Sequence, residues 1–107
     1  MLYKFKSKAT GDVIMTTEVG DRLMKILGRE PAAKGIFLPE QMPAAIATLE
    51  QAVNAEEDGF RRAAEEAAAE GRKLPAIKGV TLRQRTWPLI DMMRRAQVAG
   101  EEIVWGV

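Results

Sequence analysis

The hydrophobic and polar positions of the first sixteen residues alternate with a period of two. Tyr3 and Phe5 fall on one face of the first run, whereas Lys4 and Lys6 fall on the other. Such alternation is typical of a strand with one covered face. A glycine-containing turn leads into a second run rich in β-branched residues. The pattern therefore predicts a β-hairpin over residues 2–16.

The apolar spacing then changes to steps of three and four residues, which are typical of amphipathic helices. A first short helix is expected after Thr16 or Thr17, with Gly28 as the residue that ends it. A brief apolar run at residues 36–38 is either a further strand or a packed loop. The longest helix is expected from about residue 43 toward residue 70.

Gly59 is the weak point of this long helix, because glycine costs about 1 kcal/mol relative to alanine inside a helix. Glu57 with Arg61, and Asp58 with Arg62, have the i,i+4 spacing of stabilising ion pairs. We therefore expect the helix to continue, although a break at Gly59 stays an alternative. Glu56 interrupts the apolar stripe. Residues 63–74 are expected to project into solvent and to be mobile.

The third helix has a clear start signal, since Thr81 is followed three residues later by Gln84 in a capping-box pattern. Pro88 is expected to kink this helix or to move the start of its regular part to near Thr86. Gly100 is expected to end the helix, and residues 101–107 are expected to form a final strand in which Ile103, Trp105 and Val107 alternate.

These elements define an α+β fold in a single domain over residues 1–107. The N-terminal hairpin and the C-terminal strand are expected to share one small antiparallel or mixed sheet, because an isolated hairpin is only marginally stable. About three helices are expected to cover one face of that sheet.

The composition limits the catalytic and metal-binding chemistry that the chain is able to support. The chain of 107 residues has no histidine and no cysteine, and its net charge is +1. The commonest general base, the commonest metal ligand, the thiolate nucleophile and disulfides are therefore absent. No glycine-rich phosphate loop occurs. We expect no catalytic, cofactor or metal site, and an enzyme with a carboxylate-only site is the least favoured alternative. Without a signal peptide or a membrane-spanning run, a cytoplasmic protein without membrane association is expected.

Two groups of residues are candidates for binding. A large aromatic residue among arginines favours contact with a partner protein, although the simpler interpretation places Trp87 in the core. A row of basic residues is able to contact phosphates, although it is more often a solvated sheet face. The candidate partner surface comprises Arg83, Trp87, Asp91, Arg94 and Trp105. The candidate anion surface comprises Lys4, Lys6, Arg83 and Arg85.

Several segments together resemble a known family. They are residues 2–15, residues 38–46 with their Leu-Pro-Glu-Gln-Met-Pro motif, residues 82–90 and the closing Val-Trp-Gly-Val of residues 104–107. The chain thereby resembles a family of short, mainly proteobacterial proteins known as domain of unknown function 1840. The resemblance implies a bacterial, cytosolic origin and a single domain. The family has no assigned activity, so the resemblance carries over no functional residue.

The sequence therefore favours a small, non-enzymatic interaction or structural protein that binds a protein partner or associates with itself as a homodimer. A nucleic-acid or anionic-ligand binder that uses the lysine and arginine residues is the first alternative. That alternative requires the basic residues to share one face.

Overall fold

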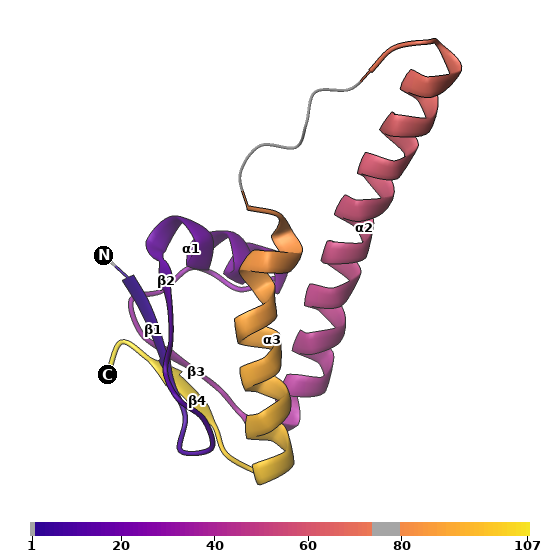
Figure 1. Ribbon diagram of the computed structural model, residues 1–107. Helices are drawn as coiled ribbons and strands as arrows, with labels where there is room; N and C mark the ends of the chain where they lie inside the picture. Colours follow the sequence, from indigo (N-terminus) through magenta and orange to yellow (C-terminus); the bar gives the residue numbers. More distant parts are fainter. Residues whose placement is uncertain (1, 74–79) are drawn as a thin grey trace.

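The computed structural model describes residues 2–73 and 80–107 and has the predicted α+β architecture. Four strands form one sheet in the order β2-β1-β4-β3, with antiparallel pairing throughout (Figure 1). The elements are β1 (Leu2–Lys6), β2 (Val13–Thr16), α1 (Thr17–Ile26), β3 (Gly35–Phe37), a short 3-10 helix (Pro39–Gln41), α2 (Met42–Ala69), α3 (Leu82–Ala99) and β4 (Ile103–Trp105).

The predicted hairpin and terminal strand are both confirmed. Tyr3 of β1 lies opposite Met15 of β2, and Phe5 of β1 lies opposite Trp105 of β4 on its other side. Tyr3, Phe5 and Trp105 are buried, because the alternation of each strand turns them toward the helices. The apolar run at residues 36–38 resolves as the edge strand β3. The sheet thus has one face covered by helices, as expected.

Helix α1 begins where the sequence indicated. The Thr16 hydroxyl accepts a hydrogen bond from the Val19 amide, which satisfies one of the first free N–H groups of the helix. Gly28 follows the helix with a φ of 74°, a conformation that glycine adopts without a steric cost. The amide of Arg29 then bonds to the carbonyl of Met24 at 2.8 Å, which closes the helix end.

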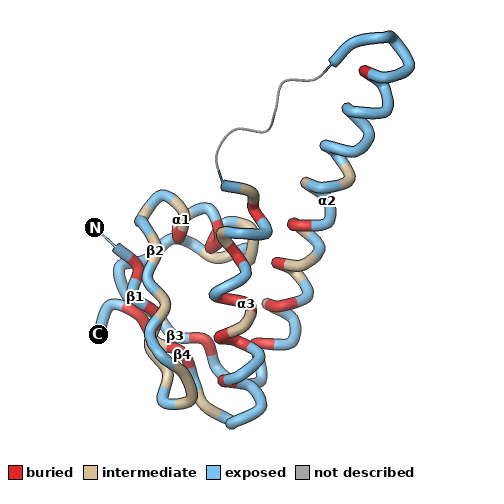
Figure 2. Tube along the Cα trace, in the orientation of Figure 1, coloured by how far each residue is buried: buried red, intermediate tan, exposed pale blue. Residues whose placement is uncertain are grey.

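Helix α2 runs without interruption through Gly59. Its first half packs against α3, and its second half extends past the start of α3 (Figure 1). Figure 2 shows this outer part as exposed along almost its whole length, and only Ala67 is buried among the described residues 61–73. Residue 74 lies outside the described residues, and the mobility of this end stays a prediction.

The ion pairs predicted within α2 are wrong. Arg61 pairs with Asp58 at 2.9 Å rather than with Glu57. Glu57 instead turns toward α3, where it binds Arg83. The sequence spacing allowed either geometry, but only the folded chain brings a guanidinium from another helix within reach of Glu57.

Helix α3 begins at Leu82, so a regular start near Thr86 is wrong. The capping box is confirmed, because the Thr81 hydroxyl accepts from the Gln84 amide and the Gln84 side chain accepts from the Thr81 amide. Pro88 removes one N–H donor, which would have bonded to the carbonyl of Gln84 one turn earlier. Gln84 is exposed, so water is able to satisfy that carbonyl, and the helix continues to Ala99.

Glu56 also supports the start of α3. Its carboxylate Oε2 accepts a hydrogen bond of 2.9 Å from the amide of Leu82, the first residue of the helix. Its other oxygen lies 3.7 Å from the guanidinium of Arg22 on α1. Glu56, which interrupts the apolar stripe of α2, therefore contacts both α1 and α3.

The core lies between the covered face of the sheet and the three helices. Four aromatic rings of the sheet are in contact, with the Phe37 and Trp105 rings 4.9 Å apart. Methionines fill part of this core, since Met24, Met42 and Met93 are fully buried. No helix within the described part of the chain is long and apolar enough to cross a membrane.

Candidate protein-interaction surface

The exposed face of α3 carries most of the residues proposed for a partner surface. Arg83, Trp87 and Asp91 follow one another at intervals of four residues, so they form one ridge along the helix. Trp87 is 55% exposed and Val98, further along the same face, is 90% exposed. The simpler interpretation of Trp87 as a core residue is therefore wrong, because Leu89, Met92 and Met93 occupy the buried side of the helix.

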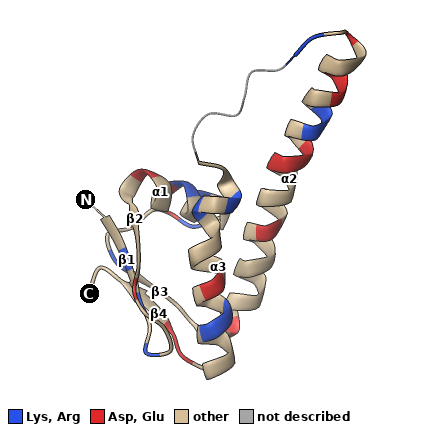
Figure 3. Ribbon diagram, viewed as in Figure 1, with Lys and Arg blue, Asp and Glu red and all other residues tan. Residues whose placement is uncertain are grey.

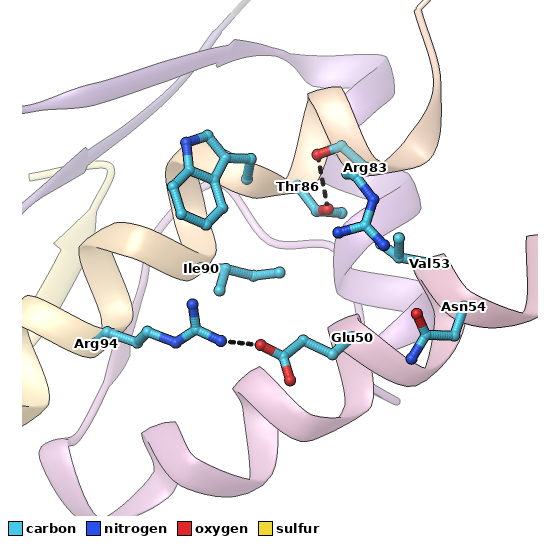
Figure 4. Close-up of a pocket in the computed structure, with 8 residues that line it drawn as sticks. Glu50, Val53, Asn54, Arg83, Thr86, Ile90 and Arg94 are labelled. Carbon is cyan, nitrogen blue, oxygen red and sulfur yellow. Dashed lines mark hydrogen bonds and ion pairs between the residues drawn. The ribbon is translucent and has the colours of Figure 1, made fainter. Parts of the chain in front are cut away.

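A pocket of about 300 Å³ lies beside this ridge, between α2 and α3 (Figure 4). Val53 and Ile90 give it an apolar floor, and the Thr86 hydroxyl is turned away to donate to the carbonyl of Leu82 at 2.9 Å. The lining residues are Glu50, Val53, Asn54, Arg83, Thr86, Trp87, Ile90 and Arg94. The pocket thus combines an exposed indole with a small apolar depression and a polar rim.

Two ion pairs connect α2 to α3 along this pocket. The Arg83 guanidinium binds Glu57 through two hydrogen bonds of 2.8 and 2.6 Å. Arg94 pairs with Glu50, which lies two turns before Glu57 on α2. The hydrogen bonds and the charge of Arg83 hold the pKa of Glu57 below its usual value, and Glu57 raises the pKa of Arg83. Both pairs are exposed to water, so they orient side chains more than they stabilise the fold.

Trp105 does not belong to this surface. It is only 3% exposed, and its indole Nε1 donates a 3.1 Å hydrogen bond to the carbonyl of Ala32. The alternation of β4 places it on the covered face of the sheet beside Phe37. Its proposed place on the partner surface is therefore wrong for a physical reason, namely that the helices and the neighbouring loop enclose it.

The four residues proposed for an anion surface do not share one face. Lys4 and Lys6 alternate with the buried Tyr3 and Phe5, so they lie on the side of the sheet away from the helices. Arg83 and Arg85 lie on α3, across the core from these lysines (Figure 3).

Two of these four basic residues also have an acidic partner already. Lys4 lies 3.6 Å from Asp12, and Arg83 is held by Glu57. Lys4, Lys6, Arg83 and Arg85 therefore do not form one continuous basic surface for phosphates.

The acidic residues of the described part of the chain are mostly engaged in structural contacts or dispersed over the surface. No three acidic side chains gather as a metal site would require there. Glu56 is engaged by the start of α3, as described above, and Asp21 accepts a 2.6 Å hydrogen bond from the Tyr3 hydroxyl. Burial, together with the hydrogen bond to Asp21 and its charge, raises the pKa of Tyr3 to about 12. These contacts serve packing, and Tyr3 is too weak an acid for proton transfer near neutral pH.

The pocket residues of α2 were not found from the sequence. Glu50, Val53 and Asn54 are not among the candidate residues that the sequence indicates. One signal was available, because Glu50 and Glu57 are seven residues apart and therefore share a helix face. Only their pairing with arginines of α3 shows that this face forms the rim of a pocket.

The fold and this surface define a small α+β domain with an exposed aromatic ridge and without a clustered acidic site among its described residues. The model of the family described as domain of unknown function (DUF1840) matches residues 1–105. The chain belongs to this family. No curated protein and no solved structure matches the chain.

Proposed function

We propose that this chain is a small, non-enzymatic interaction protein of the bacterial cytoplasm. Its contact surface is the ridge of Arg83, Trp87 and Asp91 on α3, together with the adjoining pocket. The observation that carries this proposal is that Trp87 is 55% exposed and lies beside an apolar floor. Exposed tryptophan and arginine residues around a small apolar depression are typical of the energetic centre of protein interfaces.

The energy available from this contact is substantial. Covering the exposed half of the indole removes on the order of 100 Å² of largely apolar surface from water, which is worth roughly 2–3 kcal/mol. The charges of the two ion pairs on the rim cancel, since Arg83 faces Glu57 and Arg94 faces Glu50. A protein segment with an apolar anchor fits this neutral rim better than a nucleic acid, whose phosphates need unpaired cations.

A photo-activated cross-linking amino acid with a large aromatic side chain, which keeps an apolar anchor at position 87, tests the proposal in living bacterial cells. Ile14 provides a matched control, because it is 56% exposed but lies on the uncovered face of the sheet. We expect a discrete protein cross-link from position 87 and none of comparable yield from position 14. Equal yields from both positions, or no product from position 87, would contradict the proposal.

The cross-link is then repeated with Arg83→Glu in the same chain. A specific contact loses its product, because the charge next to the anchor is reversed. A product that is unaffected indicates random encounter and counts against the surface.

A further inference from the structure

The charges of the α3 ridge are arranged so that the ridge is complementary to itself. A positive residue, Arg83, lies one turn before Trp87, and a negative residue, Asp91, lies one turn after it. Figure 3 shows basic and acidic positions following one another along this helix. When two copies of the ridge meet in opposite directions about a two-fold axis at Trp87, each arginine faces an aspartate. If the two helices ran in the same direction, Arg83 would face Arg83 of the second copy and Asp91 would face Asp91.

We propose that a second copy of this chain docks on the α3 ridge, in a symmetric antiparallel dimer. This inference rests on the proposed function and names the partner. Residues at intervals of four form a ridge inclined to the helix axis, and two such ridges lie side by side when the helices cross at about −50°. Trp87 then contacts Trp87 of the second copy, and Arg83 lies beside Asp91 of the second copy on both sides of the axis.

The existing contacts of both charged residues leave room for the partner. Arg83 uses Nε and Nη2 to bind Glu57, so Nη1 keeps its donors for a second carboxylate. Asp91 uses Oδ2 toward Arg95 at 3.1 Å, which leaves Oδ1 as an acceptor. Both intramolecular pairs are exposed, and such pairs cost little to rearrange.

The size of the surface sets the expected strength. Helix α3 has 18 residues, so it is about 27 Å long, and together with the rim of α2 it offers a face about 20 Å wide. The resulting area of roughly 540 Å² is smaller than the 800 Å² or so per partner of a standard interface. The dimer is therefore a weak one, with dissociation in the micromolar range.

Sedimentation equilibrium of two charge-reversal variants, separately and mixed, tests this arrangement. Arg83→Glu places two carboxylates together across the axis, and Asp91→Arg places two guanidinium groups together. We expect each variant alone to dimerise at least about 10-fold more weakly than the wild-type chain. An equimolar mixture restores both opposite-charge contacts, so the mixed dimer should return to within about 3-fold of the wild-type affinity.

Two further variants control for general effects. Trp87→Ala should weaken the dimer by about 30-fold, as expected for the central anchor of an interface. Arg62→Glu reverses a charge on the exposed outer part of α2 and should leave the affinity unchanged. Circular dichroism confirms that each variant is folded before its affinity is interpreted.

The outcomes separate this inference from the proposed function. A wild-type chain that stays monomeric at several hundred micromolar, or variants that gain nothing on mixing, would overturn the symmetric dimer. If position 87 still cross-links to a different protein in cells, the proposed function stands without the dimer. If position 87 cross-links to nothing and the wild-type chain also stays monomeric, both proposals fail.

Discussion

Replacing Glu56 by alanine should destabilise the fold more than any other change of an acidic residue on α2. Glu56 lies near the end of the part of α2 that α3 covers, and its carboxylate accepts the amide of Leu82 at 2.9 Å. That amide is one of the four at the start of α3 that have no partner within the helix. The carboxylate also lies at the positive end of the α3 dipole, where a negative charge is favourable.

The size of the effect follows from these two contributions. A hydrogen bond to a charged group contributes about 1.5–3 kcal/mol, and loss of a helix cap costs about 1 kcal/mol. The Glu56 side chain is 22% exposed, so water replaces part of the lost contact. Thr81 also continues to cap the helix. We therefore expect Glu56→Ala to lower the free energy of unfolding by about 2 kcal/mol, equivalent to a fall in Tm of roughly 8 °C.

Urea denaturation followed by circular dichroism measures this change. Glu56→Gln keeps an acceptor for the amide but loses the charge, so its loss should be about half as large. Glu65→Ala removes an exposed carboxylate from the outer part of α2, and its effect should stay within about 0.5 kcal/mol. If Glu56→Ala were as mild as Glu65→Ala, the capping contact would not stabilise the start of α3.

The remaining predictions concern backbone space and protonation. Gly59→Ala should stabilise α2 by up to about 1 kcal/mol in urea denaturation, since nothing lies within 4 Å of the added methyl group. Gly20→Ala should destabilise by about 2 kcal/mol or more, because its methyl group would lie 2.0 Å from the Tyr3 ring.

Ultraviolet titration of the single tyrosine should give a midpoint near pH 12. The midpoint should be lower in Asp21→Asn, because the carboxylate charge that helps to raise the pKa is removed. Stability should therefore fall with rising pH between about 10 and 12, where only the unfolded chain loses the phenolic proton. The depressed pKa of Glu57 stabilises the fold above pH 4.5 and loses this effect as the pH falls further. The difference in unfolding free energy between wild type and Glu57→Gln should therefore vanish in acid. A constant difference would contradict the ion pair.

The sequence predicted the order and type of the elements because the apolar spacing is local. The alternation of Tyr3 and Phe5 and the capping box of Thr81 are both properties of a few neighbouring residues. The helix does run through Gly59 as expected, although the two ion pairs from which its continuation was inferred do not form. The contacts between helices did not follow, because the partner of Glu57 is 26 residues away and spacing within α2 cannot indicate it.

The candidate surface was predicted in part. The spacing of residues along α3 puts Trp87 on the side opposite Leu89 and Met93, and in the structure Trp87 is exposed whereas these two residues are buried. Pro88 indicated a kink or a late start of this helix, but the helix begins at Leu82 and runs past the proline. Trp105 was assigned to the surface without regard to its strand partner Gly35, whose missing side chain leaves space for the indole ring. A residue's exposure depends on such distant neighbours, so sequence patterns alone did not determine it.

Quenching of tryptophan fluorescence by acrylamide at increasing protein concentration measures whether a second copy covers Trp87. Trp105 is buried, so in dilute solution the quencher reaches only Trp87. We expect Trp87 to be accessible in the monomer and to become protected as the chain dimerises over the micromolar range. An accessible Trp87 at every concentration, up to several hundred micromolar, would contradict a second copy on the α3 ridge.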